Sequence, residues 1–177
     1  MRWRRVYEVS GGKWEQGQGG GWTSNISTYN LSIACNHCQE PACVNACPTK
    51  ALNKNSESGF VLIDSNKCVG CRYCEWACPY GALQYDHDMG IMTKCDFCQD
   101  YLEVGNIPSC VSSCPMRALD YGELSELHEK YGNIDQVHPM PDGGLTEPSL
   151  VIKPHPESEN AEVNKARVAN LEEVKND

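Results

Sequence analysis

The sequence predicts an α+β fold in which small cysteine-rich modules carry short helices and β-hairpins. Two observations lead to this class. The phrase Cys-Pro-x-x-Ala-Leu occurs three times, at residues 47–52, 78–83 and 114–119, and three further cysteines precede each copy. After the first two copies the Ala-Leu pair begins a short strand that returns through a glycine turn, which is typical of a hairpin. A repeated module built around its cysteines is therefore expected.

The cysteine spacing indicates that these modules hold iron–sulfur clusters. Cys68, Cys71, Cys74 and Cys78 stand in the spacing C-x2-C-x2-C-x3-C and a proline follows, which is the run that bacterial ferredoxins use for 4Fe-4S clusters. Three closely spaced thiolates can converge on one cluster, whereas the fourth lies beyond the loop and reaches the cluster of the other run. The predicted class is thus ferredoxin-like, with tandem two-cluster ferredoxin modules, and electron transfer is the favoured function.

The same exchange, applied to the first two runs, completes two clusters. Each cluster takes three cysteines from one run and its fourth from the other. Soft thiolate ligands suit iron in this role. The predicted ligands are Cys35, Cys38, Cys43 and Cys78 for the first cluster, and Cys68, Cys71, Cys74 and Cys47 for the second.

The third run, Cys95, Cys98, Cys110 and Cys114, has eleven residues between its second and third cysteines. Its wide loop can still bring three sulfurs together, so a third, incomplete cluster is one interpretation. Because its two cysteine pairs could also close one tetrahedral site, zinc is the alternative here. A disulfide scaffold fits the 12 cysteines less well, since crowded C-x2-C spacings are typical of metal sites.

Composition limits the remaining classes. Aromatic residues make up only 8% of the 177 residues and mean hydropathy is −0.52, so bound metal is expected to supply part of the folding energy. A net charge of −9 disfavours nucleic acid as a partner and leaves protein surfaces as the expected contacts. Since no stretch approaches the roughly 18 apolar residues of a spanning helix, no direct membrane insertion is expected.

The segments around the runs predict further elements. Residues 3–9 and 23–33 flank a glycine-rich turn and indicate a long hairpin. Residues 124–131 carry apolar side chains at helical spacing and indicate a short amphipathic helix. Shorter hairpins are expected to pair residues 51–54 with 60–64, and 82–85 with 91–94.

An extended C-terminal arm is expected after this helix. Prolines and glycines from residue 137 onward break any long element, and residues 157–177 are mostly polar. Val163, Leu171 and Val174 could form a weak helix, but the composition favours a solvated tail.

Four residues beside the cysteines invite a functional interpretation. His37 is expected to pack or to hydrogen-bond rather than to bind iron. Trp76 is interpreted as an apolar shield that keeps water from a cluster, in preference to an electron-path residue. Arg72 and Lys94 could raise the potential of a nearby cluster by their charge, or could be solvated at the surface.

The segments between the cysteines are also distinctive. They are Trp-Arg-Arg-Val-Tyr-Glu at 3–8, Leu-Ser-Ile-Ala-Cys-Asn-His-Cys at 31–38, Cys-Arg-Tyr-Cys at 71–74, Ala-Cys-Pro-Tyr-Gly-Ala at 77–82, Met-Thr-Lys-Cys-Asp at 92–96 and Ile-Lys-Pro at 152–154. Over nearly its whole length, the sequence resembles the iron–sulfur subunit, or B subunit, of anaerobic dimethyl sulfoxide reductase. The cysteine runs alone would indicate the broader family of iron–sulfur subunits of molybdenum oxidoreductases.

The resemblance implies a non-catalytic electron-transfer subunit in anaerobic respiration. Its implied partners are a molybdopterin-containing catalytic subunit and a quinol-oxidising integral membrane anchor, which hold it peripheral to the cytoplasmic membrane. The catalytic partner then selects the terminal acceptor and sets the membrane face. The alternatives are the iron–sulfur subunit of a thiosulfate, polysulfide or tetrathionate reductase or of formate dehydrogenase, and a free-standing polyferredoxin.

One departure from the family concerns the first residues. Family members begin with a further four-cysteine run that exchanges ligands with the last run, so a truncation at Met1 is expected, the alternative being a variant in which Cys114 closes its own site. The implied organisation is an N-terminal hairpin left from an outer ferredoxin module at 1–32, an inner two-cluster module at 33–89, the second half of the outer module at 90–122, and the short helix and arm at 123–177.

Overall fold

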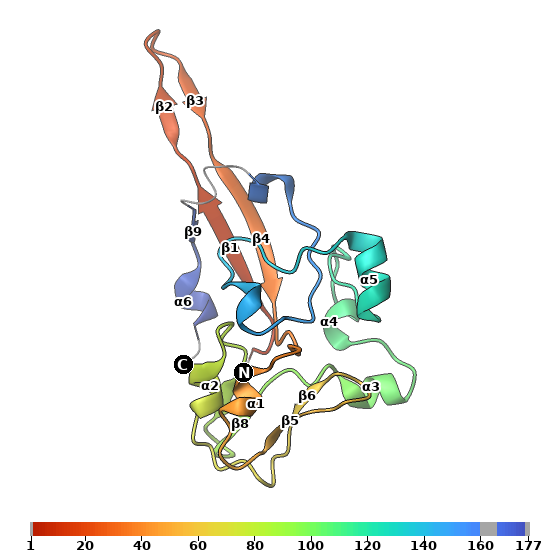
Figure 1. Cartoon of the computed structure of the whole chain (residues 1–177). Coiled ribbons are helices and arrows are strands. Elements are labelled where there is room, and N and C mark those ends of the chain that lie inside the picture. Colours follow the sequence, from red (N-terminus) through yellow and green to blue (C-terminus); the bar gives the residue numbers. More distant parts are fainter. Residues whose placement is uncertain (1, 160–165, 176–177) are drawn as a thin grey trace.

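A long antiparallel hairpin rises from a base of short helices and two-stranded sheets in the computed structural model, which describes residues 2–159 and 166–175 (Figure 1). Strand β1 (Arg5–Gly11) pairs along its whole length with β4 (Ser27–Ile33), and β2 (Trp14–Gln16) and β3 (Trp22–Ser24) extend the hairpin outward. Gly12 lies between β1 and β2 with φ +82°, where a Cβ atom would stand 2.2 Å from the Asn25 carbonyl oxygen. The predicted long hairpin is confirmed.

The base contains two similar units in succession. The first consists of α1 (Ala42–Asn45) and the hairpin of β5 (Leu52–Lys54) with β6 (Val61–Ile63). The second consists of α2 (Tyr73–Ala77) and the hairpin of β7 (Gln84–Asp86) with β8 (Ile91–Thr93). Both predicted short hairpins are confirmed, although the first strand of the second one begins at Gln84, after its Ala-Leu pair. Both Ala-Leu pairs are buried.

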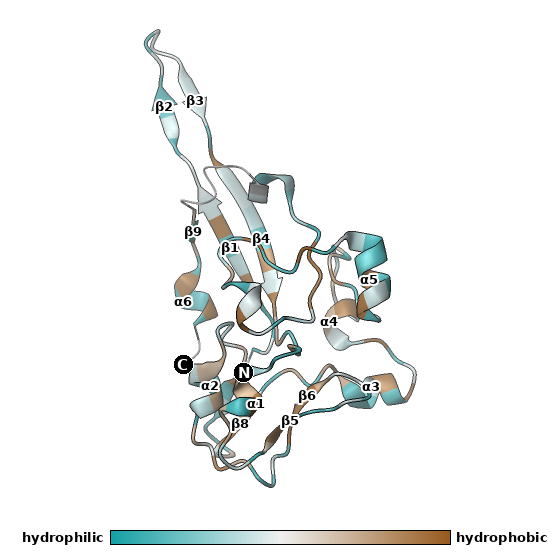
Figure 2. Cartoon of the chain, in the orientation of Figure 1, coloured by the Kyte–Doolittle hydropathy of each residue, from teal (hydrophilic) through white to brown (hydrophobic). Residues whose placement is uncertain are grey.

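The two units share one apolar core. Each contributes a buried cysteine, a buried leucine and one further buried apolar side chain, at matching places in the repeat. These residues are Cys43, Leu52 and Val61 from the first unit, and Cys74, Leu83 and Met92 from the second. Hydrophobic segments are prominent in this base, whereas the projecting strands β2 and β3 are mostly polar (Figure 2). Two cysteines are therefore held by packing as well as by their loops.

Three helices follow the repeated units. They are α3 (Gln99–Glu103), α4 (Ser109–Ser112) and α5 (Leu124–Tyr131), and α5 has the bounds that the apolar spacing predicts. Over the described ranges, none of the helices combines the length and apolar character that crossing a membrane requires.

The C-terminal arm is extended but packs on its own chain. It contains two short 3₁₀ turns, Gly143–Leu145 and Pro156–Glu159, and side chains before and between them pack against the buried face of the long hairpin. Strand β9 (Arg167–Val168) then pairs with β1, and α6 (Leu171–Val174) buries Val174. The weak helix that the composition disfavoured is thus present at 171–174 and buries Val174, whereas Leu171 is 47% exposed. Val163 lies outside the described residues. Packing against the distant hairpin supplies the stabilising contacts that this polar segment does not make by itself.

Candidate metal centres

Each Cys-Pro-x-x-Ala-Leu copy folds into the same turn, which places backbone amides around the cysteine sulfur. The residue three positions after the cysteine has a positive φ in every copy, at Lys50 (+53°), Gly81 (+58°) and Arg117 (+50°). In each copy, the backbone amides two and four positions after the cysteine favour a lower pKa of its thiol by hydrogen bonding. The Ala118 nitrogen, for example, lies 3.4 Å from Cys114 Sγ. Since N–H donors favour thiolate over thiol, the repeated phrase prepares a metal ligand.

The first group of cysteines spans both units of the base. Cys43 is buried in α1, Cys35 and Cys38 precede that helix, and Cys78 follows α2. Burial and the neighbouring Cys35, Cys78 and Cys38 thiolates raise the pKa of Cys43 to about 12. These four sulfurs therefore lie close enough to repel one another when they are ionised.

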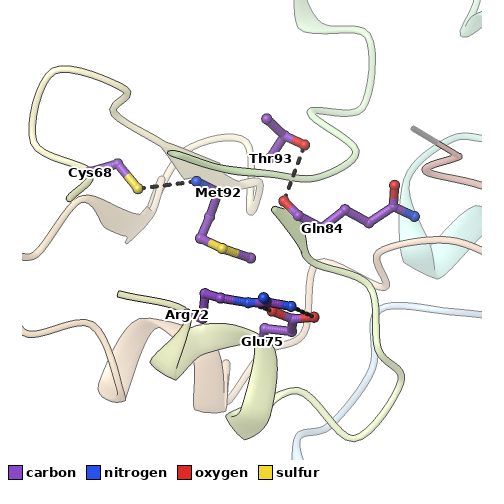
Figure 3. Close-up of polar contacts among 6 residues, drawn as sticks. All are labelled: Cys68, Arg72, Glu75, Gln84, Met92 and Thr93. Carbon is purple, nitrogen blue, oxygen red and sulfur yellow. Dashed lines mark hydrogen bonds and ion pairs between the residues drawn. The ribbon is translucent and has the colours of Figure 1, made fainter. Parts of the chain in front are cut away.

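The second group lines a small pocket in the base. Cys47, Cys68, Cys71 and Cys74 form part of its wall together with apolar side chains. Burial, followed by the thiolates of the other three cysteines, raises the pKa of Cys74 to about 11. The backbone N–H of Met92 donates to Cys68 Sγ across 3.4 Å (Figure 3). This pocket thus offers sulfur ligands with an amide donor already in place.

The two groups fit 4Fe-4S clusters by the chemistry of their donors. Cys78, from the second run, lies with the cysteines of the first, and Cys47, from the first run, lies with those of the second. Four ionised sulfurs around one small space need positive charge between them, and soft thiolates select iron in such sites. The role of these eight cysteines as iron ligands stays a prediction.

The third run is distributed over α3, which begins after Cys98, and α4, which contains Cys110. Cys98 stands at the start of α3, with its Sγ 3.8 Å from the hydroxyl oxygen of Ser109. Burial raises the pKa of Cys95, and the thiolate that also acts on it is Cys35 of the first group. Cys114 lies within its own turn, whose amides lower its pKa.

Across residues 2–159 and 166–175, no three His, Cys, Asp or Glu side chains are grouped tightly enough to hold a single metal ion. This holds for the third run and for the two crossed groups alike. The crossed groups are instead related by the effect of their sulfurs on the pKa values of Cys43 and Cys74 and by the shared pocket wall of the second group.

His37 is a buried hydrogen-bonding residue beside the first group. Its Nδ1 accepts a hydrogen bond of 3.0 Å from the Val61 N–H, and its ring contacts Phe60 and Phe97 edge-on. Burial, then the charges of Lys94 and Lys54, lower the pKa of His37 to about 3. The imidazole is therefore neutral, in agreement with a packing and hydrogen-bonding role.

Thr146 of the C-terminal arm is a site residue that sequence reasoning missed. Its buried hydroxyl bonds to Cys38 and lies 3.1 Å from the Tyr80 hydroxyl. Its carbonyl oxygen accepts the Glu40 N–H at 3.0 Å, so the arm also holds the loop after Cys38. No local pattern around Thr146 indicates this role, because the contact joins segments that are far apart in sequence.

The charged and aromatic neighbours of the cysteines divide by environment. Trp76 is 73% exposed, so the interpretation as a shield over a cluster was wrong for this chain. Arg72 pairs with Glu75, with 2.7 Å between Nε and Oε2 (Figure 3). Its guanidinium also lies over the ring of Tyr85. Lys94 is only 4% exposed, so surface solvation was the wrong alternative for this residue.

Comparisons with known proteins agree with the donor chemistry. The family model described as a 4Fe-4S dicluster domain matches residues 26–124. The B subunit of anaerobic dimethyl sulfoxide reductase from Escherichia coli (strain K12) is 48% identical over 174 residues, which cover 98% of this chain and 84% of that protein. The protein of the same name from Haemophilus influenzae is 48% identical over 88% of this chain and 75% of its own length. The selenate reductase subunit beta of Thauera selenatis is 35% identical over 78% of this chain and 47% of its own length.

Proposed function

Because the protein belongs to the family of anaerobic dimethyl sulfoxide reductase B subunits, we propose that it carries electrons to a molybdopterin-containing catalytic subunit that reduces dimethyl sulfoxide. Members of this family are iron–sulfur electron-transfer subunits of oxidoreductase complexes, and this protein is such a subunit rather than a catalytic one. The source of the electrons in this proposal is a quinol-oxidising membrane anchor, which would keep the protein peripheral to the cytoplasmic membrane.

The observation that carries the proposal is the pair of crossed cysteine groups. Cys35, Cys38, Cys43 and Cys78 would hold one 4Fe-4S cluster, and Cys47, Cys68, Cys71 and Cys74 would hold the other. When bound, each cluster can accept one electron and return it. The protein's own part is to hold the sulfurs, to direct amides at them through the repeated turn, and to limit the access of water through the shared core.

The proposal includes tandem modules and a third site. Residues 33–89 would form the inner two-cluster module, and the hairpin at 1–32 together with residues 90–122 would belong to an outer one. Cys95, Cys98 and Cys110 would form a site that takes its fourth ligand from a further cysteine run, and Cys114 would serve the cluster of that run. The turn around Cys114, which is already prepared for a thiolate, supports this assignment.

Anaerobic metal analysis of the purified complex tests the proposal. The two groups together predict at least about eight iron and eight acid-labile sulfide per polypeptide, to which a third site would add, with reversible electron paramagnetic resonance signals on reduction. A large molybdenum protein should co-purify, which a free-standing polyferredoxin would not require. Zinc without acid-labile sulfide would exclude the electron-transfer role.

The choice of acceptor can be tested on the same complex. The Escherichia coli relative has greater identity and coverage than the Thauera selenatis selenate reductase subunit, which favours dimethyl sulfoxide over selenate as the acceptor. With a reduced viologen as electron donor, the complex should oxidise the dye when dimethyl sulfoxide is added. Faster oxidation with selenate, thiosulfate or tetrathionate would move the protein to another molybdenum oxidoreductase.

A further inference from the structure

Lys94 is a buried cation whose hydrogen bonds go to neutral oxygens. It follows β8 directly and is 4% exposed. Its Nζ donates to the carbonyl oxygen of Val61 and, across 2.8 Å, to that of Cys95. Within the ranges that the structure describes, none of the ion pairs includes Lys94. Its charge is therefore not neutralised by a nearby carboxylate.

The position of this ammonium is tied to the first cysteine group. Val61 is buried in the core that contains Cys43, and its N–H holds the imidazole of His37 between two cysteines of that group. The carbonyl oxygen that accepts from the Lys94 Nζ belongs to the same residue, Val61, whose N–H reaches His37 beside Cys38. Lys94 thus follows a strand of the second unit and donates to a strand of the first, close to the first cysteine group.

Lys67 offers a matched contrast near the second group. Like Lys94, it stands immediately before the first cysteine of a run, here Cys68. However, its side chain is 62% exposed and its Nζ lies 2.9 Å from Oδ2 of Asp64. Arg72, which lies between Cys71 and Cys74 in the sequence, is likewise paired with a carboxylate, that of Glu75 (Figure 3). The positive charges of Lys67 and Arg72 are therefore neutralised or solvated.

Reduction of a 4Fe-4S cluster adds one negative charge, and a fixed buried cation stabilises that charge more strongly than an exposed, paired one does. On the basis of the proposed function, we infer that the Lys94 ammonium raises the reduction potential of the cluster held by Cys35, Cys38, Cys43 and Cys78 relative to the cluster of the second group. Lys94 is thus a positioning residue for charge, not an iron ligand.

Redox titration of the full complex, followed by electron paramagnetic resonance, tests this inference. The signal lost in Cys78→Ala identifies the first cluster, and the signal lost in Cys47→Ala identifies the second. Lys94→Gln keeps a hydrogen-bond donor but removes the charge. It should lower the equilibrium constant for reduction of the first cluster roughly tenfold, which lowers the reduction potential by about 59 mV for one electron. Lys67→Gln should leave both potentials unchanged, and Lys94→Arg should keep the first potential near its original value.

Several outcomes would overturn the inference. One is an unchanged first potential in Lys94→Gln with full iron and sulfide, and another is an equal shift from Lys67→Gln. Loss of the first cluster in both Lys94→Gln and Lys94→Arg would also overturn it, because the site would then need the shape of lysine rather than its charge. Absence of iron and sulfide from the unmodified complex would instead refute the proposed function, so the two failures are distinguishable.

Discussion

Replacement of Cys78 tests the crossed arrangement of ligands most directly. Cys78 belongs by sequence to the second run, yet it lies with Cys35, Cys38 and Cys43, where burial and the Cys35 thiolate raise its pKa. Cys78→Ala should therefore destroy the first cluster and spare the second, although three cysteines of its own run remain. Since two clusters contain about eight iron, the loss should approach about four iron per polypeptide.

The assay is iron and sulfide analysis with electron paramagnetic resonance of the reduced complex. Cys47→Ala is the reciprocal change and should remove the second signal. Cys114→Ala is a matched control, because it alters the same turn outside both groups and should keep both signals. The reasoning is refuted if Cys78→Ala leaves the first cluster intact and destroys the cluster held by Cys68, Cys71 and Cys74.

Three further substitutions test the structure around the clusters, each followed anaerobically by chemical denaturation. Thr146→Val leaves a buried Tyr80 hydroxyl without its partner and should cost about 1–3 kcal/mol of stability, whereas Thr146→Ser should cost less. Leu83→Ala removes a core side chain that is 1% exposed and should cost about 2–5 kcal/mol, while Leu145→Ala, at a residue 63% exposed, should change stability by less than about 1 kcal/mol. Arg5→Met removes a guanidinium that donates to carbonyl oxygens of Tyr80, Gly81 and Val174, and should cost about 2–4 kcal/mol; an unchanged midpoint would show that these contacts are not formed in solution.

Local elements of this fold were predictable because they depend on short-range geometry. The Cys-Pro-x-x-Ala-Leu turn needs only a positive φ three residues after the cysteine, and the same turn forms at Lys50, Gly81 and Arg117 although the side chains differ. The hairpins follow buried Ala-Leu pairs, with Leu52 as the first residue of β5 and Leu83 directly before β7. For the same reason the helix at residues 124–131 could be read from its apolar spacing alone.

The parts that were misjudged depend on contacts between distant segments. Leu171 and Val174 belong to a helix because that part of the arm packs beside β1, although their local composition is polar. Thr146 reaches Cys38 only after the chain has passed through the whole base and α5. Trp76 lies in α2 between Cys74 and Cys78, and its outward direction was decided by how that helix packs.

The sequence by itself determined the kind of metal donor, the number of sulfurs and the turns that present them, because thiolate chemistry and backbone geometry act over a few residues. Only the tertiary structure decided which charges lie beside those sulfurs and which lie in water. Lys67 and Lys94 both precede a cysteine, yet one is paired at the surface and the other is buried between two strands. The energy with which a charge acts on its neighbours depends on the local dielectric constant. That environment is formed by segments that are distant in the sequence.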